Sequence, residues 1–410
     1  MWIKSLILGC VGLFSNYCWT QQVVVLDSCQ QQAQRNYPLI KQNQLIDKST
    51  EFTLSNANKA YLPQFSISAI GGAIFSELAG SDNPNFKLIT FGQLRQTIWD
   101  GGATHSQKEI SKAAAEVEKA NVDVQLYAIR ERVNQLFFGV LLVDEQLKQL
   151  DKQLDLLNKN YKRIQALNAS GLTIKNDLNM VQAEILRVEQ KHIEFGFTRK
   201  SYLNLLSVFI GKPLAENSVL EIPIFFSPKQ EIMRPELQLF ASQSKLIETQ
   251  MATDKVRLMP KIGIMGTGAF ITPGINFANN KISSLALAGL NVSWELSGLY
   301  THSNNRQLHQ IKQEQNEIQK QTFLFNTHLQ TQQSDAEIEK YRTLEQSDAK
   351  ICVLRTSIRE NFQKQYDSGS CSFNDWLIAS EKETEAAATK VLHHVQLLLS
   401  LYQYNQLTGN

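Results

Sequence analysis

The chain is built from two copies of one unit, and this duplication limits the folds open to its 410 residues. Seven landmark pairs recur in the same order at separations of 195 to 198 positions. Self-similarity at one spacing predicts repeated structural units rather than unrelated domains. We expect a first repeat over 21–228 and a second over 229–410. The pairs are Pro38/Pro235, Pro63/Pro260, Trp99/Trp294, Gly102/Gly298, Gly171/Gly369, Asp177/Asp375 and Gly211/Gly409.

Each repeat is expected to contain a helix, a β-hairpin, a long helix and a shorter returning helix, in that order. Large residues alternate with small or polar ones at 65–69 and 262–266, which is typical of strands and predicts hairpins over 65–99 and 261–296. Only one glycine and no proline interrupt the long helices predicted over 104–168 and 302–366. The returning helices are predicted over 173–210 and 373–407.

The long segments have a seven-residue apolar repeat. Apolar residues from Leu147 to Ile164 recur at alternating spacings of three and four, the pattern of a coiled coil. At ~1.5 Å per residue, each long helix would extend for roughly 95 Å, too far for the interior of a compact domain. We therefore predict helical coiled-coil columns, each with a hairpin at one end.

The first 20 residues have the composition of a cleaved signal peptide. Lys4 precedes an apolar stretch over 5–14, and small residues precede Gln21. Ten apolar residues are too few to span roughly 30 Å of hydrocarbon. The longest later apolar run, Leu136 to Val143, has eight residues, so no transmembrane helix is expected.

Composition and motifs argue against nucleic-acid binding and enzymatic activity. The 41 basic and 39 acidic residues give a net charge of +2, which provides no basic face for phosphate. The seven histidines lack metal-ligand spacing and no nucleophile elbow is present, so no enzyme, cofactor or metal site is expected. Of the cysteines beyond the signal, Cys29, Cys352 and Cys371, the last two could pair, although free thiols are the simpler interpretation.

Four strands cannot close a barrel, and an open sheet edge is not tolerated in lipid. Closure must then come from further copies of the chain: three copies give twelve strands, and two copies give eight. Small or polar residues such as Ser66, Ser68 and Thr267 alternate with apolar ones, which suits a wall between a wet lumen and lipid. The alternative is a soluble periplasmic coiled-coil scaffold. Trp99 and Trp294 are expected to pack where sheet becomes helix, or else to lie in an interfacial belt.

Taken in order, these landmarks resemble those of the TolC-type outer-membrane efflux protein family over nearly the whole length after the signal. The segments that carry the resemblance, besides the proline landmarks, are 98–102, 206–213, 366–369 with Asp375, and 402–409. The resemblance implies a mainly α fold with β: a trimeric twelve-stranded outer-membrane β-barrel continued by a periplasmic α-helical barrel. It also implies a passive exit duct of a tripartite efflux or type I secretion system. The implied partners are a periplasmic adaptor, an inner-membrane pump or exporter, and outer-membrane lipid.

Two helix-to-helix turns are candidate contact sites. A glycine just past a helix end is usually a left-handed cap, which is a structural role. In proteins that this chain resembles, such turns form the periplasmic tips that meet the adaptor. The resemblance therefore implies adaptor contact by Gly171, Leu172, Thr173, Gly369 and Ser370.

Each turn is followed by an aspartate six residues after its glycine. For Asp177 we predict a helix N-cap and a favourable interaction with the helix dipole. For Asp375 the resemblance implies a ring of three carboxylates at the closed periplasmic mouth. One helical turn later Ile378 stands in place of a second acid, so a single acidic ring with a hydrophobic constriction is expected as the gate.

Overall fold

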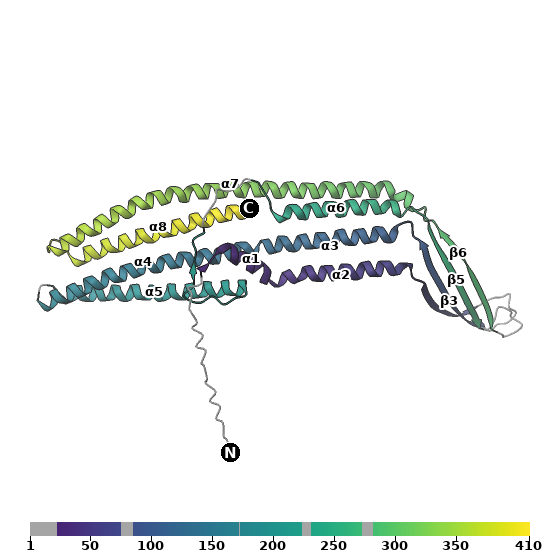
Figure 1. Ribbon diagram of the computed structural model, residues 1–410, viewed down its shortest axis with the longest axis horizontal. Helices are drawn as coiled ribbons and strands as arrows, with labels where there is room; N and C mark the ends of the chain where they lie inside the picture. The colour runs from purple at the N-terminus through teal and green to yellow at the C-terminus, as the bar shows by residue number, and fades with distance from the viewer. Residues whose placement is uncertain (1–22, 75–84, 172, 224–230, 273–281) are drawn as a thin grey trace, which may run out of the picture. The chain divides into compact units, whose positions relative to one another are not determined.

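The computed structural model describes residues 23–74, 85–171, 173–223, 231–272 and 282–410 (Figure 1). The expected signal peptide, the turn regions of both hairpins and Leu172 lie outside the described residues. The chain divides into two compact units, each drawn from both repeats. The helix-turn unit comprises the described parts of Met1–Ala33, Arg132–Phe226 and Lys340–Leu399. The sheet unit comprises those of Gln34–Glu131, Ser227–Glu339 and Ser400–Asn410.

The sheet unit contains a four-stranded antiparallel sheet (Figure 1). Its strands are β2 (Gln64–Ile74), β3 (Asn85–Trp99), β5 (Lys261–Thr272) and β6 (Ser283–Ser293), in that spatial order. The central β3–β5 pair therefore joins the two repeats. Within the described residues, β2 and β6 each pair on one side only.

Four helices of the sheet unit precede or follow these strands along the chain. They are α2 (Lys41–Asn58), α3 (Ala103–Tyr127), α6 (Pro235–Val256) and the first part of α7 (Gly298–Asp367). Helix α3 packs against both α2 and α6. Pro235 begins α6, a position where its missing N–H costs nothing.

The turn from β3 into α3 uses Asp100 and two glycines in the left-handed region, Gly101 (φ +68°) and Gly102 (φ +90°). The Asp100 carboxylate accepts the N–H groups of Gly102 at 2.9 Å and Thr104 at 2.7 Å. These bonds satisfy amide donors that the first turn of a helix leaves free. The sharp change from extended to helical backbone is thereby fixed.

The long helix expected over 104–168 is divided, which corrects the prediction of one uninterrupted element. Helix α3 ends at Tyr127, and α4 (Ile129–Ala169) begins after Ala128, whose ψ flattens to −19°. The Tyr127 hydroxyl donates to the Gln406 carbonyl at 2.8 Å, and Arg234 lies over the Tyr127 ring at 5.5 Å. These contacts coincide with the local tightening of the helix. In the second repeat, α7 runs unbroken across the expected 302–366.

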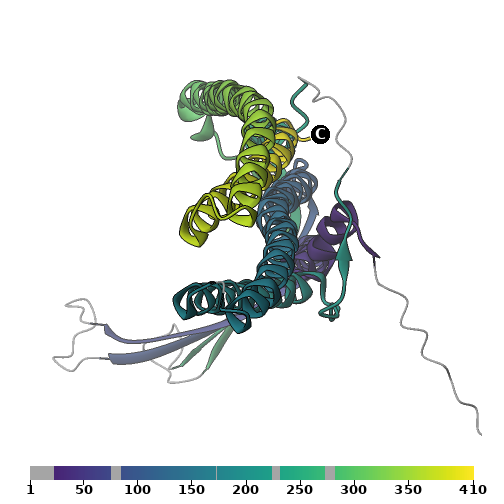
Figure 2. The same ribbon diagram turned by 90° about the vertical axis from the view of Figure 1, so that its left-hand side faces the viewer.

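The helix-turn unit consists of two helical hairpins, α4 with α5 (Lys175–Ile210) and the last part of α7 with α8 (Phe373–Thr408) (Figure 2). Helix α1 (Leu26–Asn36) begins in this unit, after strand β1 (Val23–Val24), which pairs in parallel with β4 (Val219–Leu220). Arg199 ties the segment after α5 to the helices by an ion pair with Asp144 and a 2.8 Å bond to the Ser218 carbonyl.

A heptad seam forms the core of the helix-turn unit. Leu150, Leu157 and Ile164 of α4 lie seven residues apart and are buried against α5 and α8. The opposing residues are Val181, Val188, Phe373 and Trp376. Heptad spacing keeps the buried stripe facing the partner helix over several turns. Among the described helices, none is both long enough and apolar enough to cross a membrane.

Candidate functional sites: the sheet faces and the helix turns

The strand register sorts the sheet side chains into two unlike faces, because residues directly opposite one another on paired strands share a face. One row joins Ser66 to Gln93 and Gln93 to Thr267. Alternation then assigns Ser68, Arg95 and Asn291 to this face, which we call the polar face, and it also places the apolar residues Ile70, Leu285 and Leu287 there. The other face, called the apolar face, carries Phe65, Ile67, Leu88, Leu94, Ile262, Ile264, Phe270, Leu290 and Val292.

The side chains of the apolar face are exposed in the single chain. Phe65 and Ile67 of the edge strand β2 are each 69% exposed, and Leu290 of the other edge strand is 77% exposed. Contiguous apolar surface of this kind marks contact with lipid or with another protein. A sheet that is apolar on one face and polar on the other can separate lipid from water.

The first turn, residues 170–173, closes the α4–α5 hairpin. Gly171 has φ +71°, and its N–H donates to the Asn168 carbonyl at 3.0 Å, as expected after a helix end. A Cβ added at Gly171 would meet no atom within 4 Å. Asn168 also donates to the Thr173 carbonyl at 3.0 Å. Leu172, the third candidate contact residue here, lies outside the described residues.

The second turn, residues 368–371, closes the α7–α8 hairpin with a Schellman motif. The N–H of Gly369 bonds to the Tyr366 carbonyl at 3.1 Å, and that of Ser370 to the Gln365 carbonyl at 2.8 Å. Gly369 has φ +70° and open space where a Cβ would stand. Both turns therefore need glycine for backbone conformation and leave its surface free.

Asp375 is held in a capping box at the start of α8. Its carboxylate Oδ2 accepts the Ser372 hydroxyl at 2.7 Å and the Ser372 N–H at 3.0 Å, while its own N–H donates to Ser372 Oγ at 3.2 Å. These hydrogen bonds lower the pKa of Asp375 below its ordinary value. Asp375 is exposed, and so is Ile378 at 49% on the same helix face.

Asp177 does not occupy the N-cap position expected for it. The residue preceding α5 is Ile174, with extended backbone and no side-chain cap, so Asp177 is the third residue of the helix. Its carboxylate accepts the Thr173 hydroxyl at 2.7 Å. The expected interaction with the helix dipole fits this first-turn position. The N-cap assignment failed because the chain stays extended for one residue after Thr173.

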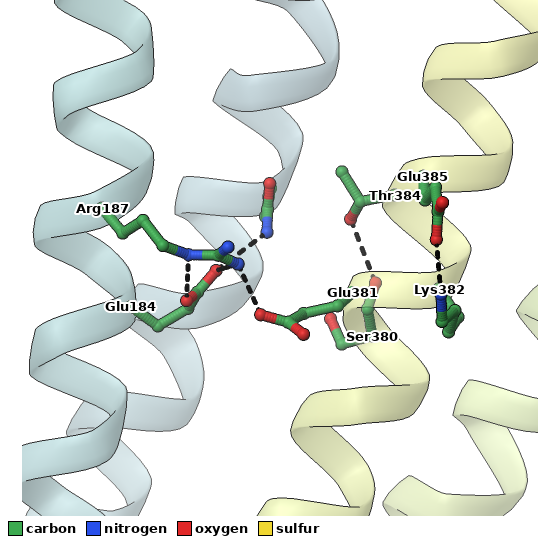
Figure 3. Close-up of polar contacts among 8 residues, drawn as sticks. Glu184, Arg187, Ser380, Glu381, Lys382, Thr384 and Glu385 are labelled. Carbon is green, nitrogen blue, oxygen red and sulfur yellow. Dashed lines mark hydrogen bonds and ion pairs between the residues drawn. The ribbon is translucent and has the colours of Figure 1, made fainter.

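Polar contacts between the two hairpins were not anticipated from the sequence. Arg187 of α5 binds both oxygens of Glu184 at 2.6 Å and also reaches Glu381 of α8 (Figure 3). The Glu184 side chain is only 7% exposed, and its other contact is Gln153 Nε2 at 3.4 Å. A single guanidinium therefore neutralises a buried carboxylate and links two hairpins. The three-residue spacing of Glu184 and Arg187 is a local pattern that could have indicated the first of these pairs, but no local pattern indicates the second.

A second link lies nearer the turns. Arg163 of α4 pairs with Asp367 at the end of α7, and its guanidinium lies 5.7 Å from the centre of the Tyr366 ring. The centre of the Phe373 ring lies 5.6 Å from the centre of the Tyr366 ring and 5.3 Å from that of the fully buried Trp376. The aromatic residues of the second turn thus pack into the core of the first hairpin.

The first repeat matches the family model described as outer membrane efflux protein over residues 30–211. Over this segment, which is less than half of the chain, the sequence is similar to that family. The protein is accordingly an outer-membrane protein related to efflux channels. No curated protein matches the sequence.

Solved outer-membrane proteins share the fold of this chain. The Campylobacter jejuni CmeC channel aligns with a TM-score of 0.63 and 15% identity, covering 94% of this chain and 85% of that one. The open state of the Neisseria gonorrhoeae MtrE channel gives 0.64 and 14%, covering 94% and 89%. Vibrio cholerae VceC gives 0.57 and 13%, covering 93% and 96%. At such identities the similarity is one of fold.

Metal-ligating side chains and cysteines are not grouped in the described part of the protein. In the described part of the chain, no three His, Cys, Asp or Glu side chains are placed to hold a metal ion. Cys29, Cys352 and Cys371 are free thiols, so the Cys352–Cys371 pair considered from the sequence is not formed. Trp294, expected to pack at the sheet–helix junction, is 61% exposed, and its indole N–H donates to the Leu258 carbonyl at 3.0 Å.

Proposed function

We propose that the protein is the outer-membrane exit duct of a tripartite efflux or type I secretion system. It would conduct substrates passively, received from an inner-membrane pump or exporter through a periplasmic adaptor. The observation that carries this proposal is the strand register, which gathers Ser66, Gln93 and Thr267 on one face of the sheet and exposed apolar side chains such as Phe65 and Leu290 on the other. A duct wall in lipid needs both, because one face contacts hydrocarbon and the other contacts water.

Closure of the sheet supports a homotrimer. The edge strands β2 and β6 run in opposite directions, since four successive neighbours are antiparallel. Strand β6 of one copy can therefore pair antiparallel with β2 of the next, and the operation repeats around a closed ring. Three copies give twelve strands with no free edge. Two copies would give eight strands. Measuring the mass of the assembled protein distinguishes this dimer from the trimer.

For the adaptor, we assign the two turns as the contact region: Gly171, Thr173, Gly369 and Ser370, together with Leu172 outside the described residues. The open space at both glycines supports this assignment, because backbone free of a side chain permits close approach of another helical hairpin. Both turns would then lie in the periplasm, where the adaptor is located.

For the gate, we assign Asp375 with Ile378. Both side chains are exposed on the first turns of α8, on the side opposite the buried Trp376. Three copies would bring three carboxylates and three isoleucines around one axis. The carboxylates would bind cations, and the isoleucines would form an apolar constriction that opposes wetting.

Closure can be tested by disulfide trapping in isolated outer membranes. Ser68→Cys on the polar face of β2 is combined with Leu287→Cys on the same face of β6, or with Ala286→Cys on the apolar face as the matched control. We expect trimers that resist SDS until heated, and covalent trimers from the Leu287 pairing only, because a one-residue shift moves a side chain to the other face. A soluble periplasmic monomer would instead support the scaffold alternative.

Adaptor contact is tested separately, with single cysteines at Thr173 and Ser370 and a crosslinker in cells that express this protein together with a periplasmic adaptor and an inner-membrane pump. We expect adaptor adducts from both turns. Cysteine at Lys159 of α4, exposed but away from the turns, is the control. Absence of adducts from both turns would show that the turns are not the adaptor contact. It would leave the proposed function as an exit duct untouched.

A further inference from the structure

A cavity of about 810 Å³ lies in the sheet unit where the strands meet the helices. It is bounded by the end of α6, the start of β5, the end of β6 and the start of α7, which meet at the helix side of the sheet (Figure 1). Pockets with a few convergent polar groups at such junctions are common ligand sites.

The charged groups of this junction pocket are unevenly paired. Arg257 and Lys261 line it, and neither has an ion-pair partner among the described residues. Asp254 is occupied by His309 at 3.0 Å, which leaves Glu295 as the carboxylate available to a ligand. His302 Nδ1 is buried at the pocket wall and has no hydrogen-bond partner in the described chain. Two cations, one polar ring nitrogen and one carboxylate therefore converge on one cavity.

The surroundings of the pocket are amphipathic. Trp294 lines it and is 61% exposed, and Tyr300, one turn into α7, is 86% exposed. Exposed Leu296 and Leu299 lie between them in the sequence. Exposed tryptophan and tyrosine beside apolar residues are enriched where a protein crosses from hydrocarbon to lipid headgroups. The aromatic rim thus places the charged cavity at headgroup depth if the sheet spans the membrane.

We propose that the junction pocket binds the headgroup of a phospholipid that carries a phosphate diester and a primary ammonium, as phosphatidylethanolamine does. Arg257 and Lys261 bind the phosphate, with His302 Nδ1 as a further hydrogen-bonding group, and Glu295 binds the ammonium. The acyl chains lie along the exposed apolar residues near Trp294. This inference rests on the proposed function, because it needs the sheet in a bilayer and this end of the strands at the periplasmic leaflet.

Charge complementarity selects this headgroup over simpler anions. Basic pockets at membrane-facing surfaces bind lipid phosphates. A phosphate with no ammonium would leave the Glu295 carboxylate beside a second negative charge, which is unfavourable at short range. A zwitterionic headgroup pairs with both signs, so ethanolamine should be preferred over glycerol as the lipid headgroup.

The test uses the full-length protein purified in detergent and titrated with dioctanoyl phosphatidylethanolamine or dioctanoyl phosphatidylglycerol, with bound lipid counted by native mass spectrometry. We expect Arg257→Gln with Lys261→Gln to weaken binding of both lipids at least ten-fold. Glu295→Gln should remove the preference for phosphatidylethanolamine while retaining binding of phosphatidylglycerol. The matched control, Lys255→Gln on α6 with Arg306→Gln on α7, removes the same amount of charge from residues outside the pocket and should bind as the parent does.

Equal lipid binding by the pocket and control variants would overturn the proposal, provided circular dichroism shows that both are folded. Inorganic phosphate that displaces lipid at equal concentration would also overturn it, since the site would then recognise a free anion. Membrane fractionation separates the two levels of inference. Parent protein absent from the outer membrane would defeat the proposed function, whereas parent protein present there with unaltered variant binding would defeat only the lipid site.

Discussion

Ser372 and Asp375 are joined in both directions at the start of α8. The Ser372 hydroxyl donates to Asp375 Oδ2 at 2.7 Å, and the Asp375 N–H donates to Ser372 Oγ at 3.2 Å. One carboxylate thus serves as a helix cap and provides the exposed charge that we assign to the gate. The two roles can be separated by mutation, because the serine takes part in the cap alone.

Loss of the charge at position 375 should open the pore mouth to ions. We expect Asp375→Asn, which keeps an oxygen able to accept the capping bonds, to abolish block by divalent cations and raise single-channel conductance in planar bilayers. Asp375→Ala should have the same electrical effect and also destabilise the start of α8, because the Ser372 N–H loses its acceptor. Ser372→Ala, the control, keeps the charge and should retain cation block. Unchanged cation block in Asp375→Asn would show that Asp375 does not line the pore mouth.

The same pair predicts a pH dependence. Hydrogen bonds from Ser372 lower the pKa of Asp375 in the folded protein. A depressed carboxyl pKa means that this stabilisation is present above the unfolded-state value and disappears as the pH falls through the folded value. Cation block should therefore persist into the acid range and vanish at a higher pH in Ser372→Ala than in the parent. Identical block-against-pH curves for the two proteins would contradict this.

Arg187 should matter more to stability than its half-exposed position suggests. Replacing it with methionine leaves the buried Glu184 carboxylate with Gln153 Nε2 at 3.4 Å as its remaining polar side-chain contact among the described residues. Breaking a buried pair costs more than breaking a surface pair, and Arg187 is 48% exposed, so we expect a loss of about 2 kcal/mol. Glu381→Gln should cost under about 1 kcal/mol, since Glu184 keeps its guanidinium. Denaturant unfolding followed by circular dichroism measures both; a larger loss in Glu381→Gln would reverse the assignment.

Two glycines with similar backbone angles should respond very differently to alanine. Gly369 (φ +70°) faces open space, so Gly369→Ala should cost about 1–2 kcal/mol through backbone strain alone. Gly409 (φ +85°) ends α8, and an added Cβ would lie 2.6 Å from the Met233 carbonyl carbon. Backbone cannot move aside as a flexible side chain does, so Gly409→Ala should cost at least about 3 kcal/mol. Equal unfolding midpoints for the two variants would show that the close contact relaxes without cost.

The repeats, the four strands and the helical hairpins followed from the sequence. Spacing of prolines, glycines and heptad apolar residues is a local property of the chain, so it predicts where elements begin, end and turn. The positions of Gly171 and Gly369 just past helix ends were recognisable for the same reason. The serine three residues before Asp375 is likewise a local capping-box pattern that the sequence alone contains.

Contacts between residues far apart in the sequence could be seen only in the tertiary structure. The break at Ala128 lies beside a tyrosine whose hydroxyl bonds to Gln406, far away in the sequence. The link from Arg187 to Glu381 and the sorting of Ser66, Gln93 and Thr267 onto one face depend on which elements pair and in what register. Periodicity fixes which side of an element is apolar, but contacts between elements arise only when packing brings their sides together. For that reason local sequence patterns were enough to predict the elements and the likeness to a family. The charged junction pocket and the contacts between the two hairpins became visible only once the elements were packed together.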